Sequence, residues 1–344
     1  DTMSEKFLIL GSNSFYGSHF VDHALQGGAY VIGISRSEEP HPVFLPYRWR
    51  HGEHLSHFRF LRLDLNHDLD KILEIIGEFK PNYIVNFASQ SMVAESWQHP
   101  EHWMVTNVVT TVRFHDRLRK CTFLKKYVHI STPEVYGSCE GLVKENTNYQ
   151  PSTPYAVSRA AADMSLMTFL NNYGFPVVFT RAANIFGPGQ QLYRIIPRSI
   201  LFFLLGRKLQ LHGGGHSVRS FIHVRDVVGG TLSVARHAIP GDIYHFSTTR
   251  NISVRTLVQM IAEKLSVSFE DNVEVVDDRP GKDSAYLLDS TKAKENLEWE
   301  SLTSLEQGLD ETIAWMKENI EELEQQPFDY IHKPGINCNR QIRT

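Results

Sequence analysis

Cysteine is scarce in this sequence. Its 344 residues include three cysteines, Cys121, Cys139 and Cys338, which lie far apart and form no Cys-x-x-Cys pair. This scarcity argues against a disulfide framework and against a zinc ribbon, and it fits a reducing compartment. We therefore expect a cytoplasmic protein.

Long hydrophobic runs are also missing. The most apolar stretch, residues 195–211, is interrupted by a proline, a glycine and three basic residues. A membrane-spanning helix needs roughly 18 apolar residues in a row, which this stretch does not supply. The first residues lack the basic-then-apolar pattern of a signal peptide. We expect no association with a membrane.

The sequence also lacks an excess of charge of either sign. The sequence has 35 Lys and Arg residues against 39 Asp and Glu residues, a net charge of -4. A weakly acidic chain offers no electrostatic case for nucleic acid as its main partner. With 42% hydrophobic and 22% charged residues, the composition is that of an ordinary globular protein.

Apolar runs of strand length alternate with helical patterns through the first half of the chain. This alternation predicts a parallel sheet that is covered by helices on both faces. Right-handed crossovers then give an α/β fold of the Rossmann type, a doubly wound parallel sheet. The expected strands are residues 7–10, 30–34, 60–63, 83–87, 127–130 and 176–179.

The first strand leads into a glycine-containing loop and then a helical pattern. Gly11 lets the backbone turn tightly, Gly17 lets the helix pack close to the strand, and the open helix N-terminus can hold a pyrophosphate. The alternative is a simple β–α turn. The loop residues expected at a dinucleotide are Gly11, Ser12, Asn13, Ser14, Phe15, Tyr16 and Gly17.

The end of the second strand indicates which dinucleotide is bound. A carboxylate there would accept hydrogen bonds from the ribose 2′-OH of NAD, but this chain has Ser35 and Arg36. A hydroxyl and a guanidinium suit a 2′-phosphate, so we prefer NADP, with NAD as the alternative. The other interpretation of Arg36 is a solvated loop arginine. Asp64 and Leu65, after the third strand, are expected near the adenine.

These patterns divide the chain into domains. We expect an NADP-binding Rossmann domain over residues 1–181, with a return segment at about 219–248. A smaller α/β substrate-binding lobe is expected from residues 182–218 and 249–320, and a C-terminal tail from residues 321–344.

Two further segments carry a specific resemblance. Residues 131–137 read Ser-Thr-Pro-Glu-Val-Tyr-Gly, and Tyr155 precedes Arg159 by four positions. The first resembles the Ser-Thr-x-Glu-Val-Tyr-Gly segment of nucleotide-sugar 4,6-dehydratases. The second resembles the Tyr-x-x-x-Lys pair of the extended short-chain dehydrogenase/reductase family. The resemblance runs from Gly11 to about Trp299, and the chain departs from the family pattern at Ser14 and Arg159.

The spacing of Tyr155 and Arg159 has a physical reason. Residues four apart lie on one helical face. A phenol with an unperturbed pKa near ~10 is a poor base at neutral pH, and a fixed cation beside it favours the phenolate. Arginine keeps the positive charge of the family's lysine but aims a planar fork differently. The alternative interpretation is an ordinary helix pair.

The resemblance implies a lyase of carbohydrate biosynthesis. In this interpretation Tyr155 takes the proton of the sugar C4 hydroxyl while hydride moves to NADP, and Thr132 holds the C4 oxygen. Glu134 removes the C5 proton, water leaves from C6, and hydride returns to C6. Pro133 stands where dTDP-glucose 4,6-dehydratases have an aspartate, so this position is closer to the GDP-mannose type.

The resemblance also implies residues that line the ligands. Phe87, Ala88 and Ser89 follow the fourth strand, where the family lines the cofactor. The substrate, a nucleotide-diphosphate sugar, is expected at Ser91, Asn184, Arg219 and Arg279. Asn184 lies in an Arg-x-x-Asn segment, and the two arginines begin an Arg-x-Phe-x-His-Val-x-Asp and an Arg-Pro-Gly-x-Asp segment.

Other functions stay open at this point. A 4-epimerase, a decarboxylase or a 4-dehydrogenase would share most of these residues. A non-catalytic nucleotide-sugar sensor is favoured by Ser14, Pro133 and Arg159. We expect no metal, because His19 and His23 lack a glutamate partner pattern. The family pairs helices that correspond to residues 101–119 and 154–173, which implies a homodimer or possibly a tetramer.

Overall fold

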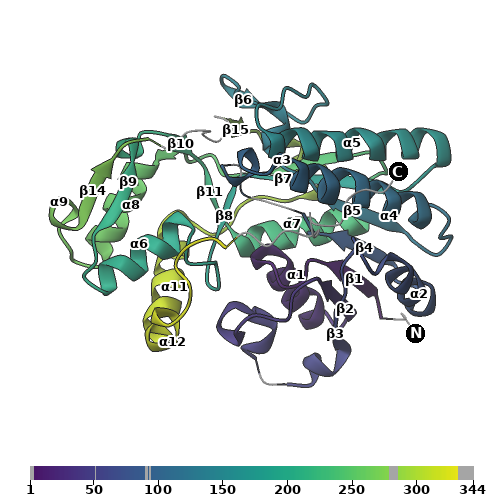
Figure 1. Cartoon of the computed structure of the whole chain (residues 1–344), viewed down its shortest axis with the longest axis horizontal. Helices are drawn as coiled ribbons and strands as arrows, with labels where there is room; N and C mark the ends of the chain where they lie inside the picture. Colours follow the sequence, from purple (N-terminus) through teal and green to yellow (C-terminus); the bar gives the residue numbers. More distant parts are fainter. Residues whose placement is uncertain (1–3, 51, 90–91, 93, 279–285, 332–344) are drawn as a thin grey trace.

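The computed structural model describes residues 4–50, 52–89, 92, 94–278 and 286–331. Two of the expected substrate residues, Ser91 and Arg279, lie outside the described residues. Figure 1 shows a large α/β domain around the central sheet and a smaller lobe to its left. Within the described residues, no helix is both long enough and apolar enough to cross a bilayer.

The central sheet has seven parallel strands in the order β12-β7-β5-β4-β1-β2-β3. This order confirms the predicted Rossmann-type fold. The strand sequence reverses between β1 and β4, and a ligand crevice forms at the carboxyl ends of the strands where such a reversal occurs. The strands are β1 (Lys6–Leu10), β2 (Tyr30–Ser35), β3 (Phe58–Arg62), β4 (Tyr83–Asn86), β5 (Lys126–Ile130), β7 (Val177–Ala182) and β12 (Ile243–Phe246).

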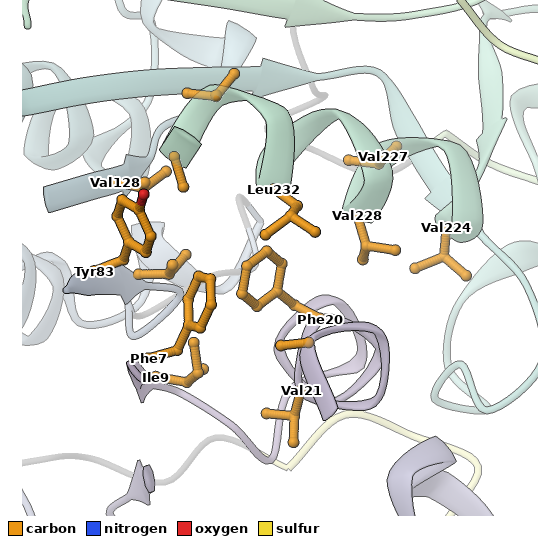
Figure 2. Packing of buried hydrophobic residues seen from close by; sticks show 14 of the residues in the cluster. Phe7, Ile9, Phe20, Val21, Tyr83, Val128, Val224, Val227, Val228 and Leu232 are labelled. Atoms are coloured by element: carbon orange, nitrogen blue, oxygen red, sulfur yellow. The ribbon is translucent and has the colours of Figure 1, made fainter. Parts of the chain in front are cut away.

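Side chains of the first strand alternate between the two faces of the sheet. Phe7 and Ile9 pack on one side with Phe20 of α1 and Val228 of α7, as Figure 2 shows. Leu8 and Leu10 pack on the opposite side under α2, α4 and α5. Both sets are fully buried, so the strands read as continuous apolar runs. The covering helices are α1 (Phe15–Gln26), α2 (Leu69–Phe79), α4 (Thr111–Leu118), α5 (Pro154–Tyr173) and α7 (Val224–His237).

The smaller lobe has its own apolar core, which includes Ile200, Leu257 and Met316. The stretch from Thr291 to Trp299 belongs elsewhere: Ala293 and Trp299 pack into the core of the sheet domain, on the face that α7 covers. The lobe contains α6 (Ile195–Leu204), β9 (Leu209–His212), α8 (Val254–Lys264), β14 (Val273–Val276), α11 (Leu305–Glu318) and α12 (Ile320–Glu324), and α10 (Thr291–Leu297) lies on the sheet domain.

The connection between β2 and β3 reaches across to the smaller lobe. Trp49 and Phe44 each lie with ring centroids 6.4 Å from Trp315 of α11. His41 lies 3.3 Å from the Glu322 carboxylate of α12. This connection contains η1 (Pro42–Phe44), η2 (Pro46–Arg48) and η3 (Glu53–His57).

Short elements complete the chain. Helices α3 and α4 flank the π-helical η5, so the expected helix of residues 101–119 is continuous but widened in its middle turn. The remaining elements are η4 (Glu95–Trp97), α3 (Pro100–Met104), η5 (Val105–Thr110), η6 (Pro133–Tyr136), β6 (Leu142–Val143), β8 (Asn184–Phe186), η7 (Gly213–Gly215), β10 (Val218–Arg219), β11 (Phe221–His223), β13 (Ile252–Ser253), α9 (Phe269–Asn272) and β15 (Leu287–Leu288).

Candidate active site

The loop after β1 requires glycine at position 11. Gly11 has φ +82°, and a Cβ atom there would lie 2.9 Å from the backbone nitrogen of Ala88. Its own N–H donates to the carbonyl of Ile34 at 2.7 Å. The loop is therefore pressed against both neighbouring strand ends, which keeps the N-terminus of α1 at the crevice.

Ser14 takes a capping role in this loop. Its hydroxyl oxygen accepts a hydrogen bond from the Gly17 N–H at 3.0 Å, and its hydroxyl donates to the Gly11 carbonyl at 2.8 Å. The side chain is thus turned back onto its own loop as the N-cap of α1. This departure from the family's glycine leaves the free N–H groups of the first helical turn facing the crevice.

Asn13 fastens the loop to the end of β2. Its N–H donates to the Ser35 hydroxyl at 3.1 Å, and its side-chain amide donates to the carbonyl of Ser37 at 3.0 Å. The amide oxygen of Asn13 and the hydroxyl of Ser12 are buried and have no hydrogen-bond partner among the described residues. Buried polar atoms are normally paired, so these two atoms fit a bound dinucleotide.

Phe15 and Tyr16, also expected at the cofactor, turn their side chains into the protein. Phe15 is 8% exposed, and the Tyr16 hydroxyl is hydrogen-bonded to Thr231 of α7. The Phe87 ring packs on Tyr16 with centroids 4.8 Å apart, while the half-buried Ser89 stays at the carboxyl end of β4.

Arg36 and Arg62 meet at the ends of β2 and β3. Arg62, at the end of β3, donates from Nε to the Arg36 carbonyl at 3.3 Å and pairs with Glu38 at 3.2 Å. The sequence analysis missed Arg62, because only strand register brings it beside β2. Asp64 accepts the Asn66 N–H at 2.8 Å, and Leu65 packs on the core beneath α2.

The predicted catalytic groups converge at the carboxyl end of β5. Thr132 follows β5 and caps η6, where its hydroxyl oxygen accepts the Glu134 N–H at 3.2 Å. Its side chain also lies near the phenol of Tyr155, in the first turn of α5, and lowers the pKa of that phenol. Thr132 and Glu134 are only 9% and 5% exposed. Pro133 supplies the fixed φ that suits the first position of the short helix.

Opposing effects act on the pKa of the Tyr155 phenol. Burial raises the pKa of its phenol, and the Glu134 carboxylate adds to this rise. The positive charge of Arg159, the hydrogen bond from Thr132 and the charge of Arg194 each lower the pKa, but burial prevails. Arg194 lies just before α6, so the second lobe also acts on the phenol, which sequence spacing could not indicate.

Arg159 is inserted between α5 and the end of β5. It is 5% exposed, and its guanidinium donates to the carbonyl of Ile130. Its Nε is buried without a hydrogen-bond partner among the described residues. The charge expected beside Tyr155 is therefore present, but part of the fork is committed to the backbone of β5.

A buried ion pair supports this corner from behind. Arg181 of β7 and Asp163 of α5 are both fully buried, with 3.0 Å between nitrogen and oxygen. Ser131 donates to the same carboxylate, and Arg181 donates to the Tyr136 hydroxyl at 2.6 Å. The segment 131–136 is thus held from both ends, which fixes Thr132 and Glu134 relative to α5.

The remaining substrate candidates lie between the two domains. Asn184 begins β8, which pairs with β11, and Arg219 ends β10, which pairs with β13. Both side chains are half-buried. The placement agrees with a ligand that spans the crevice and the lobe.

One cluster among the described residues has the composition of a metal site. Ligand atoms of His99, Glu101 and His102 lie within 4.8 Å of one another at the start of α3. His19 donates from Nε2 to the Pro188 carbonyl at 2.7 Å, and burial lowers its pKa to about 4. The expectation that no metal is bound remains a prediction.

Comparison with known proteins places this geometry in a family. A family model described as GDP-mannose 4,6 dehydratase matches residues 8–312. The chain is 34% identical to the dTDP-D-glucose 4,6-dehydratase of Homo sapiens, over 92% of this chain and 91% of that protein. It is 30% identical to the probable dTDP-glucose 4,6-dehydratase of Sinorhizobium fredii, over 91% of this chain and 93% of that protein.

A solved structure agrees with these relatives. The dTDP-glucose 4,6-dehydratase of Streptomyces venezuelae, solved with NAD and TYD bound, superposes with a TM-score of 0.83. It is 30% identical and covers 92% of this chain and 98% of that one.

The sheet order, the capped glycine loop and the Thr132–Tyr155 contact define an extended short-chain dehydrogenase/reductase that acts on nucleotide sugars. Within this class, the chain belongs to the GDP-mannose 4,6 dehydratase family. The resemblance seen in the sequence is confirmed, and with it 4,6-dehydration of a nucleotide sugar, a hydro-lyase reaction that uses a nicotinamide dinucleotide.

Proposed function

We propose that this chain converts a nucleoside-diphosphate hexose into its 4-keto-6-deoxy derivative, with Thr132, Glu134 and Tyr155 as the catalytic groups. The observation that carries the proposal is their convergence at the carboxyl end of β5, beside the crevice at β1 and β4. A phenol, a hydroxyl and a carboxylate that lie close together support this proposal, because they are the kinds of group that transfer protons in such reactions.

The first step opens at the sugar C4 hydroxyl. Tyr155 accepts its proton, while Thr132 holds the C4 oxygen by a hydrogen bond. Arg159 stabilises the phenolate by its charge. A bound nicotinamide dinucleotide supplies the hydride acceptor at C4 and the hydride donor at C6.

The elimination falls to Glu134. The 4-keto group acidifies the C5 proton, which the Glu134 carboxylate removes. Pro133 has neither a side-chain donor nor an N–H, so it cannot protonate the leaving C6 hydroxyl. We propose that Glu134 carries the C5 proton to this hydroxyl, acting as base and then as acid. Water leaves, hydride would return to C6 from the bound dinucleotide, and C5 takes up a proton from solvent while Tyr155 releases the proton it took from the C4 hydroxyl.

The preferred dinucleotide is proposed to be NADP. Arg36 and Arg62 stand together at the ends of β2 and β3, and a guanidinium suits the oxygens of a 2′-phosphate. The Streptomyces venezuelae relative was solved with NAD, so NAD is the competing cofactor. Only a direct comparison of the two affinities decides between them.

The substrate is proposed to lie across Asn184 and Arg219, with Ser91 and Arg279 as further contacts. We also propose a homodimer formed through the outer faces of α4 and α5. Val109 and Met164, on the run from α3 to α4 and on α5, are 46% and 50% exposed. Exposed apolar side chains on two neighbouring helices favour a helical contact between copies.

Mass spectrometry of the protein incubated with a panel of nucleotide sugars tests the reaction. The expected product has lost one water from a hexose. Loss of carbon dioxide would identify a decarboxylase, an unchanged mass with altered stereochemistry an epimerase, and loss of two hydrogens a 4-dehydrogenase. Bound nucleotide sugar without any product would favour the non-catalytic sensor.

A further inference from the structure

The segment from Gln325 to Ile331 leaves α12 and is fastened to α6. Arg198 of α6 donates to the Phe328 carbonyl at 2.7 Å and pairs with the Asp329 carboxylate at 3.1 Å. The Phe328 ring packs against Phe202 with centroids 6.0 Å apart. We call residues 325–331 the strap. Its backbone is held at Phe328, which fixes the position of the next residues.

Tyr330 of the strap lies where three parts of the protein meet. Its ring contacts the ring of Tyr193 edge to face, with centroids 5.4 Å apart. It also lies close enough to Arg36, Arg194 and Glu95 for their charges to act on its hydroxyl. These residues come from the end of β2, the start of α6 and the short helix η4 after β4.

The same surroundings favour an anionic ligand with hydroxyl groups. The charges of two guanidinium groups, Arg36 and Arg194, act on Tyr330 against that of one carboxylate, so the local charge is positive. One carboxylate oxygen of Glu95 is buried and has no hydrogen-bond partner among the described residues. A buried carboxylate oxygen normally accepts a hydrogen bond, and a sugar or ribose hydroxyl is a suitable donor.

The hydroxyl of Tyr330 can donate to such a ligand at any physiological pH. Burial raises its pKa to about 12, with Tyr193 and Glu95 adding to the rise and the two arginines opposing it. The hydroxyl therefore stays protonated. A hydrogen bond from a neutral donor to a phosphate oxygen is charge-assisted and stronger than one between neutral groups.

We propose that Tyr330 is a binding residue for the diphosphate group of a nucleotide held between the two domains, and that the strap keeps this nucleotide in place. The inference deepens the proposed function and rests on it. The family model ends at residue 312, so the strap is a feature outside that match. Both the dinucleotide and the nucleotide sugar carry a diphosphate, and the experiment separates them.

The test uses the full chain and the variants Tyr330→Ala and Tyr330→Phe. Dissociation of NADPH and NADH is measured by stopped-flow fluorescence, and affinity for UDP, GDP and dTDP by calorimetry. We expect Tyr330→Ala to accelerate dinucleotide release or weaken nucleoside-diphosphate binding roughly tenfold, as loss of one charge-assisted hydrogen bond predicts. Tyr330→Phe removes the same hydrogen bond and keeps the ring, so it should give a similar loss.

The strap itself is tested by Phe328→Ala, which removes the anchor but keeps the phenol. Phe328→Ala should also accelerate dinucleotide release or weaken nucleoside-diphosphate binding. Ile331→Ala is the matched control, because Ile331 is the next residue and is 63% exposed. Thermal melting shows that each variant is folded.

The outcomes are distinct. A change in dinucleotide release alone assigns the strap to the cofactor, and a change in nucleoside-diphosphate affinity alone assigns it to the substrate. Tyr330→Ala and Ile331→Ala giving the same constants in folded protein would overturn the strap proposal only. An unaltered chain that binds neither kind of nucleotide would overturn the proposed function as well.

Discussion

The Thr132 side chain lies close enough to the Tyr155 phenol to lower its pKa, although one residue follows a strand and the other begins a helix. The Thr132 oxygen already accepts the Glu134 N–H, so its own proton is free to point at the phenol oxygen. This arrangement lets Thr132 stabilise the phenolate form of Tyr155 and then serve the C4 oxygen. Removal of the hydroxyl should therefore impair oxidation at C4 before it affects binding.

The variant Thr132→Val keeps the shape of the side chain and removes the hydroxyl. We expect kcat to fall roughly 100- to 1,000-fold, the range for loss of one donor to a developing oxyanion. Dinucleotide affinity should stay within about twofold of that of the unaltered chain. The stopped-flow fluorescence experiment described for the strap checks this. Thr132→Ser is the control and should recover most of the rate. Equal rates for valine and threonine would remove this hydroxyl from the mechanism.

Glu134 is predicted to act at C5. Glu134→Gln should retain cofactor and substrate binding but lose the 4-keto-6-deoxy product, with a fall of roughly 100- to 10,000-fold for loss of a general acid–base group. Mass spectrometry in deuterated water provides the measurement, because deuterium enters the product only if the C5 proton is removed. Unchanged turnover in this variant would assign the elimination to another residue.

Arg159 is predicted to influence the pH dependence of the reaction through the pKa of Tyr155. Burial raises the pKa of the phenol and the guanidinium opposes this, so kcat/KM should rise with pH as the phenolate forms. Arg159→Gln removes the opposing charge and should move that rising limb to higher pH. Arg159→Lys keeps the charge and removes the buried, unpartnered Nε, so activity should be retained or increased.

The pH profile of kcat/KM for the three proteins checks this prediction. A limb that stays in place in Arg159→Gln would mean that the guanidinium does not act on the phenol. Loss of activity in Arg159→Lys, with fold and cofactor binding intact, would reveal a role for the planar fork. The Ile130 carbonyl, which accepts from that fork, is where such a role would lie.

We propose that the cofactor preference depends on Arg36. The unaltered chain should bind NADP more tightly than NAD, and Arg36→Asp should reverse the order by placing a carboxylate near the ribose 2′-OH. We expect the ratio of affinities to change roughly 10- to 100-fold, measured by fluorescence titration of NADPH and NADH. Arg50→Asp is the control, because Arg50 pairs with Asp22 and is 65% exposed. Tighter NAD binding by the unaltered chain would contradict our interpretation of Arg36.

The buried pair of Asp163 and Arg181 should dominate the stability of the site. Asp163→Asn leaves the guanidinium buried without its counter-charge, which costs about 3–5 kcal/mol of unfolding free energy. The control is Asp310→Asn, which breaks a pair with Lys264 in which Asp310 is 66% exposed, and costs about 0–1 kcal/mol. Urea unfolding of both variants compares the two. Similar losses would show that the buried pair contributes no more than a surface pair.

The sheet and the grouping of Thr132, Glu134 and Tyr155 could be predicted from the sequence, because their sequence patterns are local. An apolar run such as residues 7–10 marks a buried strand by itself, and Tyr155 and Arg159 share a helical face by spacing alone. Residues 131–137 follow a strand and resemble a known segment, so Thr132 and Glu134 could be named. The domain boundaries and the roles of individual ligand-binding residues stay predictions.

What could not be predicted depends on contacts between distant segments. Arg62 reaches Arg36 only through the register of β2 and β3, and Arg194 acts on Tyr155 from the second lobe. Ser14 looked like a departure in the phosphate loop, but its backbone lets the side chain cap α1. Tyr330 carried no pattern at all, because its surroundings exist only in the folded chain.

The connection between β2 and β3 has a consequence for how molecules enter and leave. Trp49 and His41 tie the domain that carries the sheet directly to α11 and α12, so the two parts are linked by side chains as well as by the crossings of the chain. A hinge motion that separates the two domains would have to break these side-chain contacts. We therefore expect exchange to proceed by small local shifts near the rim, with the overall frame staying rigid from one turnover to the next.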